Sequence, residues 1–227
     1  MRPFSEIFAM AVGHRGSAGA VEALLPVAKS RDELAAIPDH RWLAALTRAV
    51  FQAGFNWKVI EAKWPGFEQA FDGFDPNRWA MMSDEDLDRL TADTRVVRNA
   101  AKLKSVGDNA AMLVALAREH GSAAAVFADW PADDYAGLLQ LLKDRGNRLG
   151  GAAAQYALRS LGRDGYVLGG DVVVALIREG VIDKPPTSRS AMAGVQAAFN
   201  RWMAESGRGL GAISRTLALS VGPRSPV

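Results

Sequence analysis

The segment of residues 51–57 combines aromatic and amide side chains in a pattern that could hold a flat aromatic ligand. Trp57 offers an indole face, and an aromatic face stabilises a stacked nucleic-acid base by about 1–3 kcal/mol. Gln52, Phe55 and Asn56 lie close to Trp57 in the sequence, at a predicted helix end and turn. The alternative is burial, because aromatic residues often lie in the core. Trp57 would then pack there with the phenylalanines of residues 67–74.

A second segment, residues 165–176, has glycines between two predicted helices. Leu168, Gly169 and Gly170 come directly before a predicted helix that begins at Asp171. Glycine lets a backbone approach a phosphate closely, and the amides at a helix N-terminus bind anions. The same residues would also form an ordinary helix start without a ligand.

Basic side chains in residues 95–104 could contact phosphates, and they are Arg95, Arg98, Lys102 and Lys104. Arg98 and Lys102 are four residues apart, which places them on one side of a predicted helix. A solvated helix face has the same pattern, so the residues alone do not decide between the two interpretations.

Helical signals recur along the whole chain and predict an all-α fold. Residues 30–33 and 83–86 have the capping-box pattern, Asp39 and Asn56 can cap two further helices, and Pro65 is expected to interrupt the second of these. Later helices are predicted over residues 132–145, 150–161, 171–179, 188–206 and 210–220. Glycines at the expected C-terminal caps are Gly121, Gly146, Gly162 and Gly180.

The composition is that of a globular protein, with 49% hydrophobic and 23% charged residues in 227. We expect one domain over residues 1–221, with room for two lobes around a cleft, and a flexible tail at residues 222–227. The net charge of +2 permits nucleic-acid binding without favouring it. No metal site is expected, because the three histidines are not at zinc-ligand spacing. The most apolar run, residues 172–177, is too short to span a bilayer, so the expected location is cytoplasmic.

Four ordered blocks within residues 42–116 resemble the DNA-3-methyladenine glycosylase I family of the helix-hairpin-helix superfamily. The blocks are residues 51–57, 67–76, 96–103 and the pair Asn109-Ala110. The first three correspond to the family's Gln-Ala-Gly-Leu-Ser-Trp, Ala-Phe…Phe-Asp-Pro and Ile-Ile-Arg-Asn…Lys-Ile segments, in the same order. The resemblance implies a helix-hairpin-helix glycosylase-like fold, double-stranded DNA as the partner and no cofactor.

The resemblance also implies roles for individual residues. Trp57 matches the family position that stacks on the base, and Gln52, Phe55 and Asn56 would lie nearby, on the helix end and turn that shape the pocket. Residues 168–170 resemble the hairpin, with the glycines shifted by about one position. Asp183 occupies a place similar to that of the superfamily's aspartate, which stabilises the positive sugar or activates water. Asp183 also suits a plain turn before Lys184 and two prolines.

Three features depart from the family. The chain has no cysteine, so the family's structural zinc site of two cysteines and two histidines is not expected. No tyrosine precedes Tyr135, although the family stacks an earlier tyrosine on the base. Ala49 stands where the family has a glutamate, whose charged hydrogen bond recognises a cationic base. Either another acid makes that contact, with Glu61 and Asp183 as candidates, or the substrate differs, or the activity is lost.

We therefore expect a DNA glycosylase that flips an alkylated purine such as 3-methyladenine out of the duplex and hydrolyses its N-glycosidic bond. The alternative is a catalytically inactive helix-hairpin-helix DNA-binding module, whose affinity would depend on salt. A helical protein-interaction domain is a third hypothesis. Nothing in the sequence requires more than a monomer.

Overall fold

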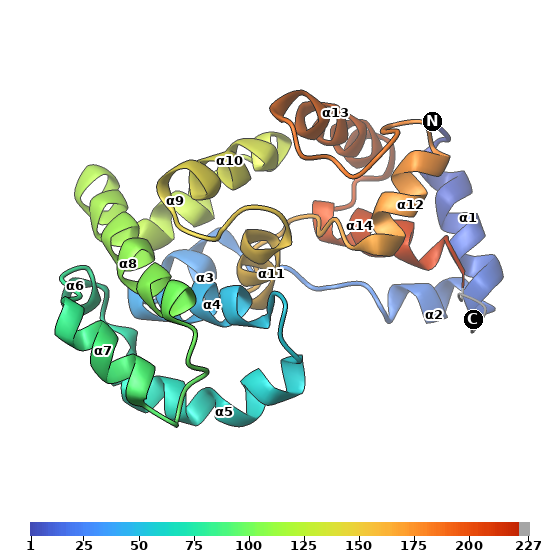
Figure 1. The fold of residues 1–227 in the computed structure, drawn as a ribbon. Coiled ribbons are helices and arrows are strands. Elements are labelled where there is room, and N and C mark those ends of the chain that lie inside the picture. Colours follow the sequence, from blue (N-terminus) through green and yellow to red (C-terminus); the bar gives the residue numbers. More distant parts are fainter. Residues whose placement is uncertain (223–227) are drawn as a thin grey trace. The chain divides into compact units, whose positions relative to one another are not determined.

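Helices form the secondary structure of residues 1–222, the part of the chain that the structure describes, and no β-strand occurs among them (Figure 1). The structure is a computed structural model of the 227-residue chain. It confirms the predicted all-α class. None of the helices in residues 1–222 is long and apolar enough to cross a membrane. Apart from Gly222, the tail expected at residues 222–227 lies outside the described residues.

The helices follow one another with short connections. The α-helices are α1 (Phe4–Arg15), α2 (Ala18–Glu22), α3 (Arg31–Ala35), α4 (Asp39–Gln52), α5 (Trp57–Ala70), α6 (Pro76–Trp79), α7 (Asp84–Ala92), α8 (Ala100–His120), α9 (Ala123–Asp129), α10 (Tyr135–Arg145), α11 (Ala152–Ser160), α12 (Gly170–Arg178), α13 (Arg189–Ser206) and α14 (Leu210–Leu219). Short 3-10 helices are η1 (Asp72–Phe74) and η2 (Ala132–Asp134).

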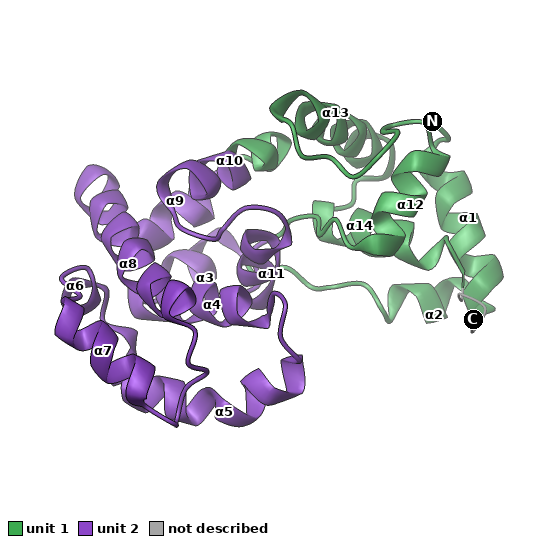
Figure 2. Ribbon diagram, in the orientation of Figure 1, with its two compact units in different colours: residues 1–29, 131–137, 164–227 green, residues 30–130, 138–163 purple. Residues whose placement is uncertain are grey.

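Two compact units divide the chain, and each is made of separate segments (Figure 2). Unit 1 comprises residues 1–29, 131–137 and 164–227, and unit 2 comprises residues 30–130 and 138–163. In unit 2, α4 packs against α5, α8 and α11. Small side chains allow helices to pack closely, and the buried residues of α11 include the alanines Ala153, Ala154 and Ala157.

In unit 1, α14 packs against α1, α12 and α13 around an apolar core. A buried carboxylate also belongs to this unit: Glu179, after the last residue of α12, is only 3% exposed. It accepts hydrogen bonds from the backbone amide of Arg2 (3.0 Å), the Arg2 guanidinium (2.8 Å) and Nε of Arg178 (2.8 Å). Arg178 in turn donates to the carbonyl and hydroxyl oxygens of Ser220. The network joins the N-terminal residues to α12 and to the end of α14.

Several predicted local signals are confirmed. Both capping boxes are present, Ser30 with Glu33 before α3 and Ser83 with Asp86 before α7. The side chain of Asn56 caps α5 by accepting a hydrogen bond from the amide of Lys58 at 2.9 Å. These motifs act within a few residues, which is why the sequence alone identifies them.

Two local predictions are wrong. Asp39 does not cap its own helix but lies in the first turn of α4, where its carboxylate accepts a hydrogen bond from the amide of Ala124 in α9. Pro65 does not interrupt α5, which continues through it to Ala70. Gly146 directly follows α10, as predicted for a C-terminal cap, but it does not have the positive φ of Gly121, Gly162 and Gly180. A β-carbon there would lie 2.7 Å from the carbonyl oxygen of Leu142, so close packing explains this glycine.

A carboxylate distant in sequence caps α14, whose N-cap residue, Gly209, offers no side chain. Asp164 accepts hydrogen bonds from the amides of Leu210 (2.9 Å) and Gly211 (2.8 Å). Replacing Asp164 with alanine is expected to lower the free energy of unfolding by about 1–2 kcal/mol, because two helix amides lose their acceptor. Urea unfolding measures the loss, and Asp88→Ala on the exposed face of α7 is the control. Equal stability of both variants would show that water replaces the cap without cost.

Candidate functional site

Trp57 is the first residue of α5 and is 49% exposed, whereas Phe67, Phe71 and Phe74 are fully buried. Burial in the core therefore accounts for the three phenylalanines and not for Trp57. The indole meets the ring of Tyr156 in α11 edge to face, with centroids 5.4 Å apart and planes at 88°. Aromatic pairs favour this geometry. About half of the Trp57 surface remains open to a ligand.

A cluster of stacked aromatic rings supports α5 from within unit 2. Trp64 stacks on Phe67 and Phe74 with centroid distances of 5.4 and 5.5 Å. Its indole Nε1 donates to Glu68 at 2.9 Å, and the Arg41 guanidinium donates to both oxygens of the same carboxylate. Burial raises the pKa of Glu68, but the hydrogen bonds from Arg41 and Trp64 outweigh it, so the pKa is lowered overall. The helix that presents Trp57 is thus fixed by packing and by a charged network.

Glu61 lies one helical turn after Trp57, and this spacing places both on one face of α5. Its Oε1 accepts a hydrogen bond from Nε2 of Gln52 at 2.9 Å and lies 3.8 Å from Nε of Arg48. The Arg48 guanidinium also lies over the Trp64 ring, 4.2 Å from its centroid. A carboxylate and an amide, both able to bond a base edge, therefore share α5 and the end of α4 with the exposed indole.

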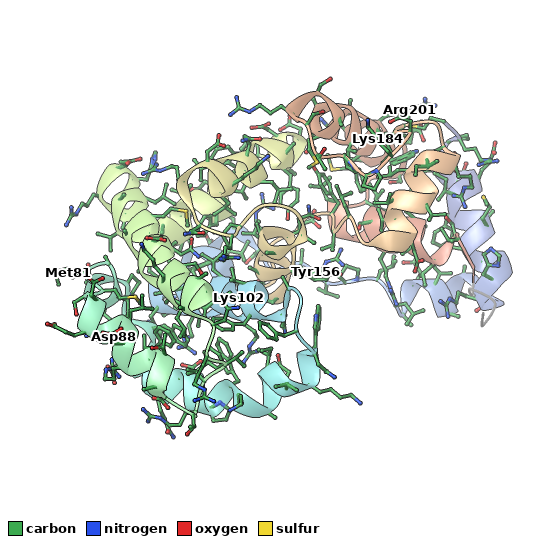
Figure 3. All side chains as sticks on the ribbon, viewed as in Figure 1. Met81, Asp88, Lys102, Tyr156, Lys184 and Arg201 are labelled. Carbon is green, nitrogen blue, oxygen red and sulfur yellow. The ribbon has the colours of Figure 1, made fainter. Side chains whose placement is uncertain are left out.

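Lys102 differs from the predicted phosphate contact. It is 8% exposed, and its Nζ donates to the carbonyl oxygens of Val50 (2.8 Å) and Ala53 at the end of α4. Nζ also lies 4.4 Å from the ring centroid of Phe55, which is 37% exposed. Burial and the nearby positive charge of Arg148 lower the pKa of Lys102. Figure 3 labels Lys102 near the start of α8 and Tyr156 on α11.

The other basic candidates, Arg95, Arg98 and Lys104, differ in whether an ion pair already engages them. Arg98 precedes α8, so it does not share a helix face with Lys102 as the spacing had suggested. Arg95 pairs with Asp93 at 2.6 Å. Arg98 and Lys104 are exposed, and neither forms an ion pair within residues 1–222. They are the members of this group that remain available to a phosphate.

The predicted hairpin residues belong to unit 1. Gly169 is the N-cap of α12, which begins at Gly170 and has no side-chain cap. Gly165 serves a different purpose from the predicted approach to a phosphate, because a β-carbon there would overlap the ring of Tyr135. Close packing against an aromatic ring selects this glycine.

Asp183 also belongs to unit 1, in the turn after α12, and it is exposed. This is the environment expected of a turn residue. The structure thus brings Gln52, Phe55, Asn56, Trp57 and Glu61 together in unit 2. It does not place Asp183 or the hairpin residues in that unit.

Sequence reasoning missed two residues of the site, Tyr156 and Arg48. The helix that carries Tyr156 was predicted at residues 150–161, but its packing against α4 depends on contacts between distant segments. Arg48 and Gln52 are one turn apart on α4, and this spacing was the available signal for a shared face. Within residues 1–222, no group of three or more histidine, aspartate or glutamate side chains could hold a metal ion.

Comparison with known proteins gives a consistent set of similarities. A model of the methyladenine glycosylase family matches residues 35–148. The chain is 34% identical over 59 residues to DNA-3-methyladenine glycosylase 1 of Escherichia coli (strain K12), covering 26% of this chain and 32% of that protein. It is 32% identical over 65 residues to DNA-3-methyladenine glycosylase of Haemophilus influenzae, covering 29% of this chain and 35% of that protein. The matches thus span about a third of the length of these curated relatives.

A solved structure of 3-methyladenine DNA glycosylase I from Staphylococcus aureus is 22% identical, with a TM-score of 0.46. The similarity covers 64% of this chain and 84% of that one.

Proposed function

The chain belongs to the methyladenine glycosylase family, whose model spans half of its residues, and from this premise we propose that it excises alkylated purines from double-stranded DNA. In this proposal the target nucleotide turns out of the duplex and its base stacks on Trp57. The product is a free base such as 3-methyladenine and an abasic site in the DNA.

The half-exposed indole of Trp57 is the observation that carries the proposal. A buried tryptophan could not stack on a ligand, and this one is presented by a helix that is held from within the unit. Glu61, one turn along α5, is our candidate for the acid that Ala49 does not supply. Ala49 is 5% exposed in α4 and has no polar side-chain atom to offer.

The reaction is a hydrolysis. Water adds to the anomeric carbon of the sugar while the bond from that carbon to the purine nitrogen breaks. A nucleotide whose base is 3-methyladenine carries a positive charge on that base. The bonding electrons leave with the base, which therefore departs neutral. The proton of the attacking water passes to solvent or to a nearby carboxylate. Such a leaving group needs only modest electrostatic help. A carboxylate near the sugar can provide it, because the positive charge moves from the base to the sugar as the bond breaks.

Contact with the DNA backbone is assigned to exposed cations and to backbone amides. We assign Arg98 and Lys104 of unit 2 to phosphates, together with residues 168–170 at the start of α12. Asp183 is the second candidate acid.

The test is release of purines from duplex DNA treated with a methylating agent, with the released bases separated and identified. Release of 3-methyladenine by the wild-type protein supports the proposal. Intact binding to DNA without release of any base would instead identify a non-catalytic DNA-binding module.

Replacement of Glu61 with glutamine is expected to lower kcat/KM for base release by about 10- to 100-fold, because a charged hydrogen bond becomes a neutral one. Gln52 retains a partner in this variant, so the fold should be unchanged. Glu85→Gln, an exposed change on α7, serves as the matched control. Asp183→Asn is measured beside them, and a loss in that variant with none in Glu61→Gln would transfer the acid's role to Asp183.

A further inference from the structure

We propose that Lys102 is a positioning residue of the base pocket, whose buried ammonium fixes the loop of residues 53–56 and thereby the placement of Trp57. The inference rests on the proposed function for its effect on catalysis. Its effect on Trp57 can be measured independently.

The ammonium serves as the C-terminal cap of α4. The last four carbonyls of a helix lack partners within the helix, and a cation is favoured at that end. Nζ of Lys102 lies 2.8 Å from the carbonyl oxygen of Val50 and 3.5 Å from that of Phe51, and it also bonds that of Ala53. An ammonium has three donors, and these three carbonyls can take all of them.

The same group reaches the loop that leads to the pocket. Ala53 is the first residue after α4, and Phe55, two residues later, has its ring centroid 4.4 Å from Nζ. Asn56 then caps α5, and Trp57 is the first residue of that helix. Lys102 therefore holds both the start and the middle of the short connection between α4 and the indole.

A phosphate contact by Lys102 is inconsistent with this geometry. The residue is 8% exposed and its donors face carbonyl oxygens, so reaching a phosphate would leave those buried carbonyls unpaired. A purely structural role would affect unfolding alone, whereas a positioning role also changes the environment of Trp57 in the folded protein.

The experiment removes and then restores the ammonium in the full chain. Lys102→Met removes it. Lys102→Cys gives the only thiol of a chain that has no cysteine. Alkylation of the unfolded protein with 2-bromoethylamine rebuilds a lysine-like ammonium after refolding, and alkylation with iodoacetamide leaves a neutral side chain. Lys143→Met, an exposed change on α10, is the control.

Two readouts are followed: the indole N–H resonance of Trp57, assigned by its loss in Trp57→Ala, and kcat/KM on methylated duplex DNA. In both neutral proteins we expect the Trp57 resonance to shift or broaden while that of Trp202 in unit 1 stays, and kcat/KM to fall by about 10- to 100-fold. The aminoethylated protein should recover both properties.

An unchanged Trp57 resonance in the neutral proteins would overturn the proposal. So would failure of the aminoethylated protein to recover it, because the ammonium would then not be the cause. If Lys102→Met does not fold, the two alkylated proteins decide between the outcomes. If the wild-type protein releases no base, the proposed function fails, and the resonance alone still tests the positioning role.

Discussion

Trp57→Ala is expected to lower kcat/KM for release of 3-methyladenine from methylated duplex DNA by about 5- to 150-fold. This range corresponds to the loss of about 1–3 kcal/mol of stacking on the flipped base. The free energy of unfolding should change little, because the indole is 49% exposed and its described ring contact is a single edge with Tyr156. The assay is single-turnover base release, with urea unfolding measured on the same preparations.

Met81→Ala provides the matched control, since Met81 is 74% exposed and follows α6 in the same unit. It removes a large exposed side chain away from the proposed pocket and should leave base release unchanged. Equal base release by Trp57→Ala and the wild-type protein would remove Trp57 from the site. The exposed indole would then need a different explanation, such as a contact with a protein partner.

Glu179→Gln is expected to lower the free energy of unfolding by about 2–4 kcal/mol at neutral pH. The carboxylate side chain is 1% exposed, and the change removes the charge that satisfies both Arg2 and Arg178. Removing one partner of a buried ion pair leaves the other charge uncompensated, although here the arginines partly reach solvent and soften the loss. Urea unfolding at pH 7 measures the difference.

The pH dependence gives a second measurement of the same network. Burial raises the pKa of Glu179, but the hydrogen bonds from the Arg2 amide and the two guanidinium groups lower it more, so the net pKa lies below 4.5. The stabilisation is therefore complete above pH 4.5 and is lost as the pH falls through the folded-state pKa. The difference in free energy of unfolding between the wild-type protein and Glu179→Gln should therefore become smaller as the pH falls through that pKa.

Glu6→Gln is the control for this comparison, because Glu6 also approaches Arg2, at 4.0 Å, but its side chain is 61% exposed. Exposed ion pairs contribute about 0–1 kcal/mol, so this variant should remain close to wild type. A Glu6→Gln loss as large as that of Glu179→Gln would show that burial does not determine the effect.

The sequence predicted features that depend on nearby residues. The capping boxes before α3 and α7 and the cap at Asn56 act over two or three positions, and all are present. The segment around Trp57 was also identified, because its residues are consecutive. Whether the indole was buried could not be predicted, since that depends on which distant helices cover it.

The features that the sequence did not predict depend on contacts between distant segments. Lys102 has the sequence pattern of a surface cation. It is buried because it bonds the end of α4, about fifty residues earlier in the chain. Asp39 has the residue type of a helix cap and does cap a helix, but that helix is α9. Tyr156 meets Trp57 across nearly a hundred residues. No local pattern contains the partner in any of these pairs.

Unit 1 is assembled from segments on both sides of unit 2 in the sequence, and this order has a consequence for folding during synthesis on the ribosome. Helix α1 is synthesised before unit 2, yet its partners α13 and α14 are synthesised after unit 2. At translation rates of about 5–20 residues per second, this delay is roughly 10–40 seconds. Unit 2 lies within residues 30–163 and can be completed in that interval, while Phe4, Ile7 and Ala11 of α1 still lack the helices that bury them. The burial of α1 is therefore completed late in synthesis, and so is the Arg2–Glu179 contact.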